Sequence, residues 1–283
     1  MIPTSKSSAP SVQWSYVPEE IAAKEPVLDA VTETELEIIA RDVARLASDS
    51  VRAKLGTARE IGTKSTPTDT VTSADLETEG LIRDALRLAT PGASIIGEEG
   101  TDVEGTSDIG WIIDPIDGTV NFLYELPVVA VSIAATRKDE VIAGAVADVL
   151  RMEVFTASRG HGARLNWRDI RTSTVSDIAE SLIATGFSYS SQRRGTEAEI
   201  VTRILPVARD IRCFGSAALN LAWVACGRVD GYWESDTNRW DIAAGVLLAE
   251  EAGAIVELDA TATGSVLAAP PALVDALRQL VSG

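Results

Sequence analysis

The sequence is poor in the side chains that most often bind zinc or form disulfides. Its 283 residues include one histidine and two cysteines. A zinc site made of several histidines is therefore excluded. Cys213 and Cys226 are not spaced as a CxxC motif and suggest no disulfide framework. We expect both to be reduced residues buried in helices, and we expect His161, which stands between two glycines, to lie in an exposed turn.

Basic residues are also scarce, because 25 Lys and Arg face 42 Asp and Glu, and the formal net charge is −17. Such a surface repels nucleic acid and anionic lipid. No segment approaches the roughly 18 consecutive apolar residues of a membrane span, and residues 1–10 contain no apolar leader. We therefore expect a cytoplasmic protein with no nucleic-acid or membrane partner, in which a phosphorylated substrate depends on bound cations.

The first 31 residues differ in composition from the rest of the chain. Prolines at positions 3, 10, 18 and 26 exclude a long helix, and the run 5–10 is rich in serine. We expect residues 1–31 to form a flexible arm, in which Trp14 and Tyr16 are available to dock on a partner or on the body. Residues 32–283 contain no internal repeat and no second linker, so we expect them to form one domain.

Helical and strand patterns alternate in blocks after residue 32. Apolar residues between Leu36 and Leu55 recur at helical spacing, and Gly56 marks the end of that helix. Further helices are predicted over 76–88, 196–208, 216–226, 240–252 and 270–281. Strands are predicted over 94–96, 110–113, 128–135, 141–149, 152–157, 182–184, 212–214 and 254–256. The pattern indicates a mixed α/β fold in which layers of helices pack against sheets.

Acidic residues gather at three points where a strand ends or a helix begins. Glu98 and Glu99 follow one predicted strand, Asp114 and Asp117 follow another, and Asp241 opens a predicted helix. Oxygen ligands of this kind suit Mg²⁺, Mn²⁺ or Ca²⁺ rather than zinc. Each group alone is equally typical of a helix cap or a solvated turn. Together, in a chain with a single histidine, they favour a metal site.

The segment around Asp114 and Asp117 also has features of a phosphate site. Pro115 stiffens the predicted turn between the two aspartates, which lets both carboxylates converge on one side. Gly118 allows the backbone to approach a ligand closely, and Thr119 adds a hydroxyl. If a helix begins here, its free N–H groups form an anion site.

Segment 64–75 contains two charged residues whose roles the sequence leaves open. Lys64 follows Gly62 and precedes a serine, but the spacing of a P-loop is absent. Lys64 is as typical of a solvated loop as of a binding site. Asp75 fits the N-cap or first turn of the helix predicted over 76–88 as well as it fits a chemical role.

The chain resembles the inositol monophosphatase family in four segments. They are 64–75, Gly97-Glu98-Glu99, the run from Trp111 to Phe122, and the run from Trp240 to Gly245. The second run, WIIDPIDGTVNF, is long enough to be highly specific. The similarity extends over about residues 35–260 and leaves the predicted arm unmatched. It implies a layered α/β/α/β/α sandwich, a homodimer and inhibition by lithium.

The resemblance also implies a metal centre. Mg²⁺, as two or three ions and with Mn²⁺ as a substitute, would be held by Glu98, Asp114, Asp117, Asp241 and the backbone carbonyl of Ile116.

The same resemblance implies the other groups of the reaction. Gly118 and Thr119 would meet the phosphate. Thr119 together with Asp75 would orient and deprotonate the attacking water, and Glu98 would hold a metal that polarises this water. Supporting roles would fall to Lys64, Asp69 and Glu99.

Substrate choice depends on residues outside these runs. By resemblance, the polyol would be lined by Ser188, Gly215, Ser216, Ala217 and Glu234, although Ser216-Ala217 equally fits a helix start. Arg239 stands in an Asn-Arg pair where many members carry His-Cys, and it would face a second anionic group.

These residues favour a Mg²⁺-dependent phosphomonoesterase that hydrolyses myo-inositol monophosphate by attack of metal-activated water. Fructose 1,6-bisphosphate, histidinol phosphate and 3′-phosphoadenosine 5′-phosphate are alternative substrates. A non-catalytic metal-binding interaction protein is the alternative from another class. Such a descendant would have lost Asp75, Thr119 or a metal ligand, and this sequence retains all of them.

Overall fold

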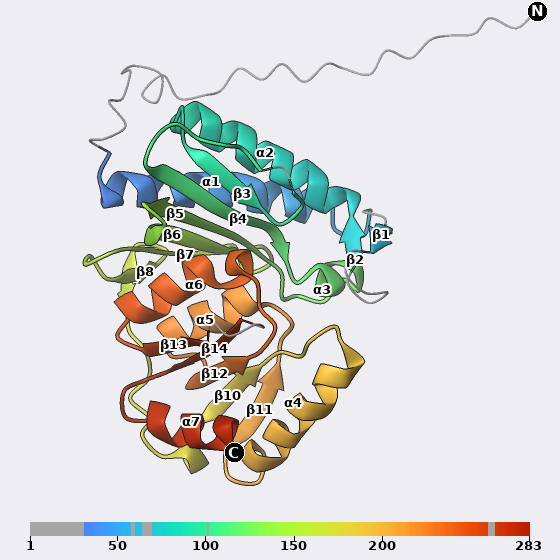
Figure 1. Ribbon diagram of the computed structural model, residues 1–283, viewed down its shortest axis with the longest axis vertical. Helices are drawn as coiled ribbons and strands as arrows, with labels where there is room; N and C mark the ends of the chain where they lie inside the picture. Colours follow the sequence, from blue (N-terminus) through green and yellow to red (C-terminus); the bar gives the residue numbers. More distant parts are fainter. Residues whose placement is uncertain (1–30, 58–59, 64–69, 101, 260–263) are drawn as a thin grey trace, which may run out of the picture.

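The computed structural model describes residues 31–57, 60–63, 70–100, 102–259 and 264–283. The predicted arm over 1–31 therefore lies, apart from its last residue, outside the described part. Five layers follow one another along the long axis of the molecule: two helices, a seven-stranded sheet, two buried helices, a five-stranded sheet and two outer helices (Figure 1). This is the α/β/α/β/α sandwich that the family resemblance implied.

The first layer consists of α1 (Glu33–Ala53) and α2 (Ser73–Ala89). Both helices begin at a capping box. In each, the side chain of the N-cap threonine accepts a hydrogen bond from a backbone N–H of the first turn, and an acidic side chain of that turn accepts one from the backbone N–H of the threonine. The acidic partner in α2 is Asp75. Apolar residues of both helices pack against one face of the larger sheet, and both helices confirm the periodicity seen in the sequence.

The seven-stranded sheet has the order β3-β4-β5-β6-β7-β8-β9. Its strands are Ser94–Gly97, Ile109–Asp117, Ala130–Arg137, Glu140–Asp148, Glu153–Ser158, Ala163–Leu165 and Arg168–Ile170. Only β3 and β4 run parallel. β4 continues through Asp117, with a register shift against β5 between Asp114 and Asp117. The expected turn around Pro115 is therefore wrong, because pairing with β5 keeps this segment extended.

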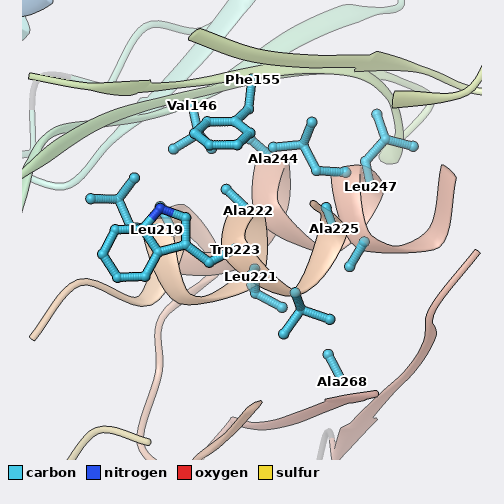
Figure 2. Packing of buried hydrophobic residues seen from close by; sticks show 14 of the residues in the cluster. Val146, Phe155, Leu219, Leu221, Ala222, Trp223, Ala225, Ala244, Leu247 and Ala268 are labelled. Carbon is cyan, nitrogen blue, oxygen red and sulfur yellow. The ribbon is translucent and has the colours of Figure 1, made fainter. Parts of the chain in front are cut away.

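The middle layer consists of α5 (Ala217–Ala225) and α6 (Arg239–Glu251). Every residue of α5 is buried. Figure 2 shows why: Val146 and Phe155 of the larger sheet lie on one side of α5, and Ala268 of the smaller sheet lies on the other. Small residues set the spacing of the layers, since a Cβ on Gly144 of β6 would lie 3.1 Å from the Cβ of Ala244 in α6. Within the layer, a Cβ on Gly245 would lie 2.7 Å from that of Leu221 in α5.

The five-stranded sheet has the order β11-β10-β12-β14-β13. Its strands, in that order, are Asp210–Cys213, Leu182–Thr185, Gly231–Glu234, Ser265–Ala269 and Ile255–Asp259. The outer helices α4 (Ser191–Ile204) and α7 (Val274–Ser282) cover it. Three short elements complete the described chain: a hairpin of β1 (Glu60–Thr63) and β2 (Thr70–Thr72), α3 (Thr119–Leu123), and a 3₁₀ turn, η2 (Ile178–Glu180).

The two cysteines differ from the expectation of buried helix residues. Cys213 ends β11 and is exposed, and Cys226 is half-buried at the C-cap of α5; both are free thiols. His161 is exposed, as expected. Within the described ranges, no helix combines the length and the apolar character that a membrane span requires.

Candidate active site

A cavity of about 800 Å³ opens beside the helical layer that separates the two sheets, at the first turns of α5 and α6. Its walls come from the ends of β4, β10 and β12 and from the first turns of α3, α5 and α6. Strand ends and helix starts expose backbone N–H groups and short polar side chains, so a polar wall here follows from the topology.

Four carboxylates that the sequence singled out line this cavity. Asp114 and Asp117 lie on the irregular end of β4, Glu98 follows β3, and Asp241 lies in the first turn of α6. The parallel pairing of β3 with β4 brings Glu98 beside Asp114, and the backbone N–H of Glu98 donates to the carbonyl of Ile113 over 3.3 Å. Ile116, whose carbonyl was predicted as a ligand, lines the same wall.

Burial and mutual repulsion raise the pKa of three of these carboxylates, those of Asp114, Asp117 and Asp241. Burial, followed by the charge of Glu98, raises the pKa of Asp114 and the pKa of Asp241 well above their ordinary values. Burial also raises the pKa of Asp117, to about 6. Grouped buried acids of this kind need a cation to ionise fully at neutral pH.

Asp117 is held by the N-terminus of α5. One of its carboxylate oxygens accepts from the hydroxyl of Ser216 over 2.5 Å and from the N–H of Ala218 over 2.8 Å. The other accepts from the N–H of Ala217 over 3.2 Å. These bonds favour the ionised carboxylate and oppose part of the rise in the pKa of Asp117 that burial causes.

Gly118 and Thr119 form the turn from β4 into α3. Gly118 adopts φ +94°, and a Cβ on it would lie 3.0 Å from the carbonyls of Val128 and Gly215, so only glycine fits. The hydroxyl of Thr119 donates to Asp75, at 3.2 Å, and also lies 3.0 Å from the carbonyl oxygen of Ile116. The structure thus brings the predicted pair Asp75 and Thr119 together, with Thr119 on the cavity wall.

Asp75 is also a structural residue, as the sequence left open. It is fully buried, and its second oxygen accepts from the backbone N–H of Thr72 over 2.8 Å in the capping box of α2. One carboxylate therefore fixes the start of α2 and the hydroxyl of Thr119 at the same time.

Glu234 forms the opposite wall, at the end of β12. The hydroxyl of the buried Tyr232 donates to Glu234 over 2.7 Å. Burial raises the pKa of Glu234 to about 7, against the opposite effect of this bond. Gly186 makes room for the carboxylate, because a Cβ at that position would lie 2.1 Å from it.

The remaining predicted residues differ in their placement. Ser188, Gly215, Ser216 and Ala217 line the cavity. Arg239 does not line it, and its guanidinium donates to the carbonyl of Asp139 over 3.0 Å instead. Glu99 is also absent from the walls; its N–H donates to Glu79 over 2.8 Å. Lys64 and Asp69 lie outside the described residues.

Sequence reasoning missed four residues that shape the cavity: Asn121, Arg193, Tyr232 and Asp236. Tyr232 could have been predicted, because it stands two residues before Glu234 in the same strand and its side chain therefore lies on the same face of the sheet. Asn121 was read only as part of a motif, although its amide donates to the carbonyl of Val128 over 2.9 Å and to that of Phe214 over 2.7 Å. No local pattern marked Arg193 and Asp236, which reach the cavity from α4 and from the loop after β12.

The carboxylates line one cavity, but they do not converge on a single coordination position. Among the described residues, no three Asp, Glu, His or Cys side chains already stand at the spacing of a metal site. The set is nevertheless chemically suited to a hard cation, because its members are oxygen donors and because burial and mutual repulsion oppose the ionisation of Asp114 and Asp241.

Comparisons with known proteins agree with one another. A model described as "Inositol monophosphatase family" matches residues 32–281. A Mycobacterium leprae protein named inositol-1-monophosphatase is 43% identical over 258 residues, which cover 85% of this chain and 84% of that protein. The Nus factor SuhB of Escherichia coli K12 is 44% identical over 217 residues, which cover 74% of this chain and 81% of that protein. The crystal structure of the extragenic suppressor protein suhB of Bartonella henselae has a TM-score of 0.82 and 32% identity, and the match covers 87% of this chain and 98% of that one.

Proposed function

Because this chain belongs to the inositol monophosphatase family and is a phosphoric monoester hydrolase, we propose that it hydrolyses myo-inositol monophosphate in a Mg²⁺-dependent reaction. One observation carries the proposal: a single cavity combines four carboxylates, of which Asp114 and Asp117 are buried, the backbone N–H groups at the start of α3, and the further carboxylate of Glu234. The first set suits a metal, the second suits a phosphate, and Glu234 suits the hydroxyls of a polyol.

Two or three Mg²⁺ ions would be held by Glu98, Asp114, Asp117, Asp241 and the carbonyl of Ile116, with Mn²⁺ as a substitute. Bound there, a divalent ion lowers the pKa of a coordinated water and neutralises phosphate charge, which explains how a chain with a net charge of −17 accepts an anionic substrate. Small movements of these side chains would close the set, since they already face the same cavity.

The protein's own groups position the water and the phosphate. The Thr119 hydroxyl, held by Asp75, orients a water at the cavity wall. The hydroxyl oxygen takes a proton from this water while its own proton passes to the carboxylate of Asp75. The N–H groups of Gly118 and Thr119 lie at the start of α3 and donate hydrogen bonds to the phosphate oxygens. No side chain of this constellation needs to form a covalent phosphoenzyme.

At the other end of the cavity, Glu234 accepts hydrogen bonds from the ring hydroxyls of the polyol. Tyr232 stabilises its ionised form, and Gly186 leaves the space that the carboxylate occupies. Ser188 and the segment Gly215 to Ala217 complete this wall.

Metal binding is tested with Asp114→Asn, titrated with Mg²⁺ by calorimetry. The variant removes a negative charge from the centre, so we expect Mg²⁺ affinity and turnover to fall at least a hundredfold, given that even outer-sphere changes cost about 10–100-fold. Asp84→Asn, at an exposed position on α2, is the matched control and should change neither. Normal Mg²⁺ affinity in Asp114→Asn would contradict the assignment.

Substrate class is tested by phosphate release with Mg²⁺, with EDTA and with lithium. The panel contains inositol 1-phosphate, fructose 1,6-bisphosphate, histidinol phosphate and 3′-phosphoadenosine 5′-phosphate. We expect Mg²⁺-dependent, lithium-sensitive release led by inositol 1-phosphate. Release led by another compound keeps the phosphatase and changes the substrate, whereas Mg²⁺ binding without any release favours the non-catalytic alternative.

We further propose that the enzyme is a cytoplasmic homodimer and that residues 1–31 form an arm outside the catalytic domain 32–283. Exposed apolar side chains at Tyr124 (76% exposed) and Met152 (67% exposed) support the dimer. Their loops are joined by a bond from Arg151 to the carbonyl of Pro127. Light scattering of the full chain and of a chain lacking residues 1–31 tests both statements: the expected result is a dimer in each case, with equal activity.

A further inference from the structure

The cavity has an uneven charge distribution beyond the proposed metal ligands. The acidic side chains that line it are Glu98, Asp114, Asp117, Glu234, Asp236 and Asp241. Among the described lining residues, Arg193 is the only basic one. With the metal ligands neutralised by cations, the wall that faces the rest of the substrate carries Arg193, Asp236 and Glu234.

Arg193 reaches this wall from the first turn of α4, where it is paired. Its guanidinium contacts one oxygen of Asp236 in a salt bridge. The other oxygen of Asp236 accepts from the hydroxyl of Ser188, at 2.5 Å. Asp236 therefore neutralises the positive charge of Arg193 at the cavity wall, where that charge would otherwise attract an anionic ligand.

The backbone of Asp236 turns through the left-handed region, with φ +67°. Aspartate is one of the few residues besides glycine that adopts this region readily in turns.

Glu197 and Arg194 of α4 fix the loops on both sides of this pair. The buried carboxylate of Glu197 accepts from the N–H of Ser188 over 3.0 Å and from the hydroxyl of Ser235 over 2.5 Å. Arg194 donates to the carbonyl of Ser188 over 2.9 Å. The loop after β10 and the loop after β12 are thus joined through one helix, and the contact between Arg193 and Asp236 is pre-organised.

We propose that Asp236 masks Arg193 and thereby restricts the cavity to substrates that carry one phosphate. This inference rests on the proposed phosphatase function and specifies its substrate class. A second phosphate reaching this wall meets Asp236 and Glu234, and it gains the arginine only by displacing Asp236. The hydroxyls of a polyol meet no such penalty, because both members of a salt bridge remain able to bind neutral groups.

The test compares two substrates that differ only in a second phosphate, fructose 1-phosphate and fructose 1,6-bisphosphate. Asp236→Asn removes the charge and keeps an oxygen for Ser188. We expect it to raise the ratio of kcat/KM for the bisphosphate to kcat/KM for the monophosphate about tenfold, the scale of one poorly screened charge at the rim of a pocket. Arg193→Gln should lower the ratio by a similar factor, because it leaves the charge of Asp236 uncompensated. In Asp236→Asn/Arg193→Gln the gain should disappear.

Controls separate this inference from the phosphatase proposal. Asp210→Asn breaks the salt bridge to Arg212 in β11, away from the cavity walls, and should leave the ratio unchanged. Equilibrium binding of both fructose phosphates to the Mg²⁺-loaded variants gives the same ratio without turnover, so the masking is decided even if neither sugar is hydrolysed.

An unchanged ratio in Asp236→Asn would overturn the masking, as would a gain that survives in the double variant or a rise of the ratio in Arg193→Gln alone. Failure to hydrolyse inositol 1-phosphate, with the ratio of binding constants still shifted in Asp236→Asn, would instead reject myo-inositol monophosphate as the substrate and leave the masking in place.

Discussion

Several residues of the cavity have two structural roles at once. Asp75 caps α2 and holds Thr119. Asp117 lines the cavity and accepts from the N-terminus of α5. The sequence identified both residues by motif but left open whether they were caps or chemical groups. In each case the structural role is present and does not exclude the proposed chemical role, because a carboxylate has two oxygens with separate lone pairs. Substitutions that spare the structural role are therefore the more informative tests.

Thr119→Val keeps the shape of the side chain and removes the hydroxyl that orients the water. We expect kcat to fall about 10²- to 10⁴-fold, the usual contribution of a positioned proton acceptor and its relay. The free energy of unfolding should fall by only about 1 kcal/mol, the net value of one buried hydrogen bond. Steady-state kinetics and urea denaturation measure the two effects. Thr119→Ser should retain most of the activity, and near-normal kcat in Thr119→Val would remove Thr119 from the mechanism.

Tyr232→Phe tests the ionisation of Glu234. The tyrosine hydroxyl donates to the carboxylate and so lowers its pKa, which burial has raised to about 7. Without that bond the pKa rises further, so the pH above which KM for inositol 1-phosphate improves should move upwards. The readout is KM between pH 5.5 and 9. Glu234→Gln is the control: its KM should show no such dependence on pH, while its Mg²⁺ affinity stays normal. If the pH dependence of KM is the same in Tyr232→Phe as in the unchanged protein, a group other than Glu234 is responsible for it.

At the scale of elements, the site depends on short connections between the two sheets. Asn121 of α3 donates to the carbonyls of Val128, before β5, and of Phe214, after β11. Gly215 leaves the space for this amide, because a Cβ there would lie 2.9 Å from its nitrogen. This contact joins the loop after β4, which presents Gly118 and Thr119, to the loop that begins α5.

Asn121→Ala should loosen that connection. We expect the free energy of unfolding to fall by about 1–3 kcal/mol, because two carbonyls lose a buried donor. We also expect kcat to fall, because Thr119 and Ala217 are then held less well relative to each other. Asn121→Asp, which keeps the shape but cannot donate, should behave at least as badly. Unchanged stability in both variants would show that the contact is dispensable.

The sequence predicted some elements better than others for identifiable reasons. α1 and α2 bury one regular apolar face, so their periodicity was visible. α4 was predicted over 196–208 but covers 191–204, because Glu197 and Ile204 are its only buried residues and no apolar stripe marks its start. β4 was predicted to end before Asp114, yet pairing with the next strand, β5, extends it to Asp117. β14 was missed, because it is short and rich in alanine and depends on its neighbours in the sheet.

The same distinction applies to the site. The residues that we predicted in the cavity belong to long local runs, such as Asp114 to Thr119. The pair of Arg193 and Asp236 is separated by 42 intervening positions, and only the packing of α4 against the loop after β12 brings it together. A single sequence holds no local signal for such a contact.

At the scale of the whole molecule, the grouped acids couple folding to pH and to metal. The pKa values of Asp117 and Glu234 rise on folding from 3.8 and 4.5 to about 6 and about 7. The folded protein therefore holds protons that the unfolded chain releases. Stability is greatest below the unfolded pKa values and is lost as the pH rises through the folded ones.

In EDTA we expect the free energy of unfolding to fall between about pH 4 and pH 7, by roughly 3 kcal/mol for each of these two groups. Mg²⁺ favours the ionised carboxylates and should flatten this dependence, adding about 2.7 kcal/mol at a hundredfold excess over its Kd. Urea denaturation at several pH values, with Mg²⁺ and with EDTA, measures both effects. The slope in EDTA should shrink in Glu234→Gln. Apo stability that rises over this range would contradict the argument.

The small residues between the layers also constrain how the sequence can diverge. Gly144 faces Ala244 across one boundary, and Gly245 faces Leu221 within the helical layer. A methyl group added at one of these positions has to be removed from its partner, because the facing backbones are fixed by both sheets. Changes at 144 and 244, and at 245 and 221, should therefore be inherited as compensated pairs, and a chimera that exchanges one half of such a pair between relatives should fail to fold.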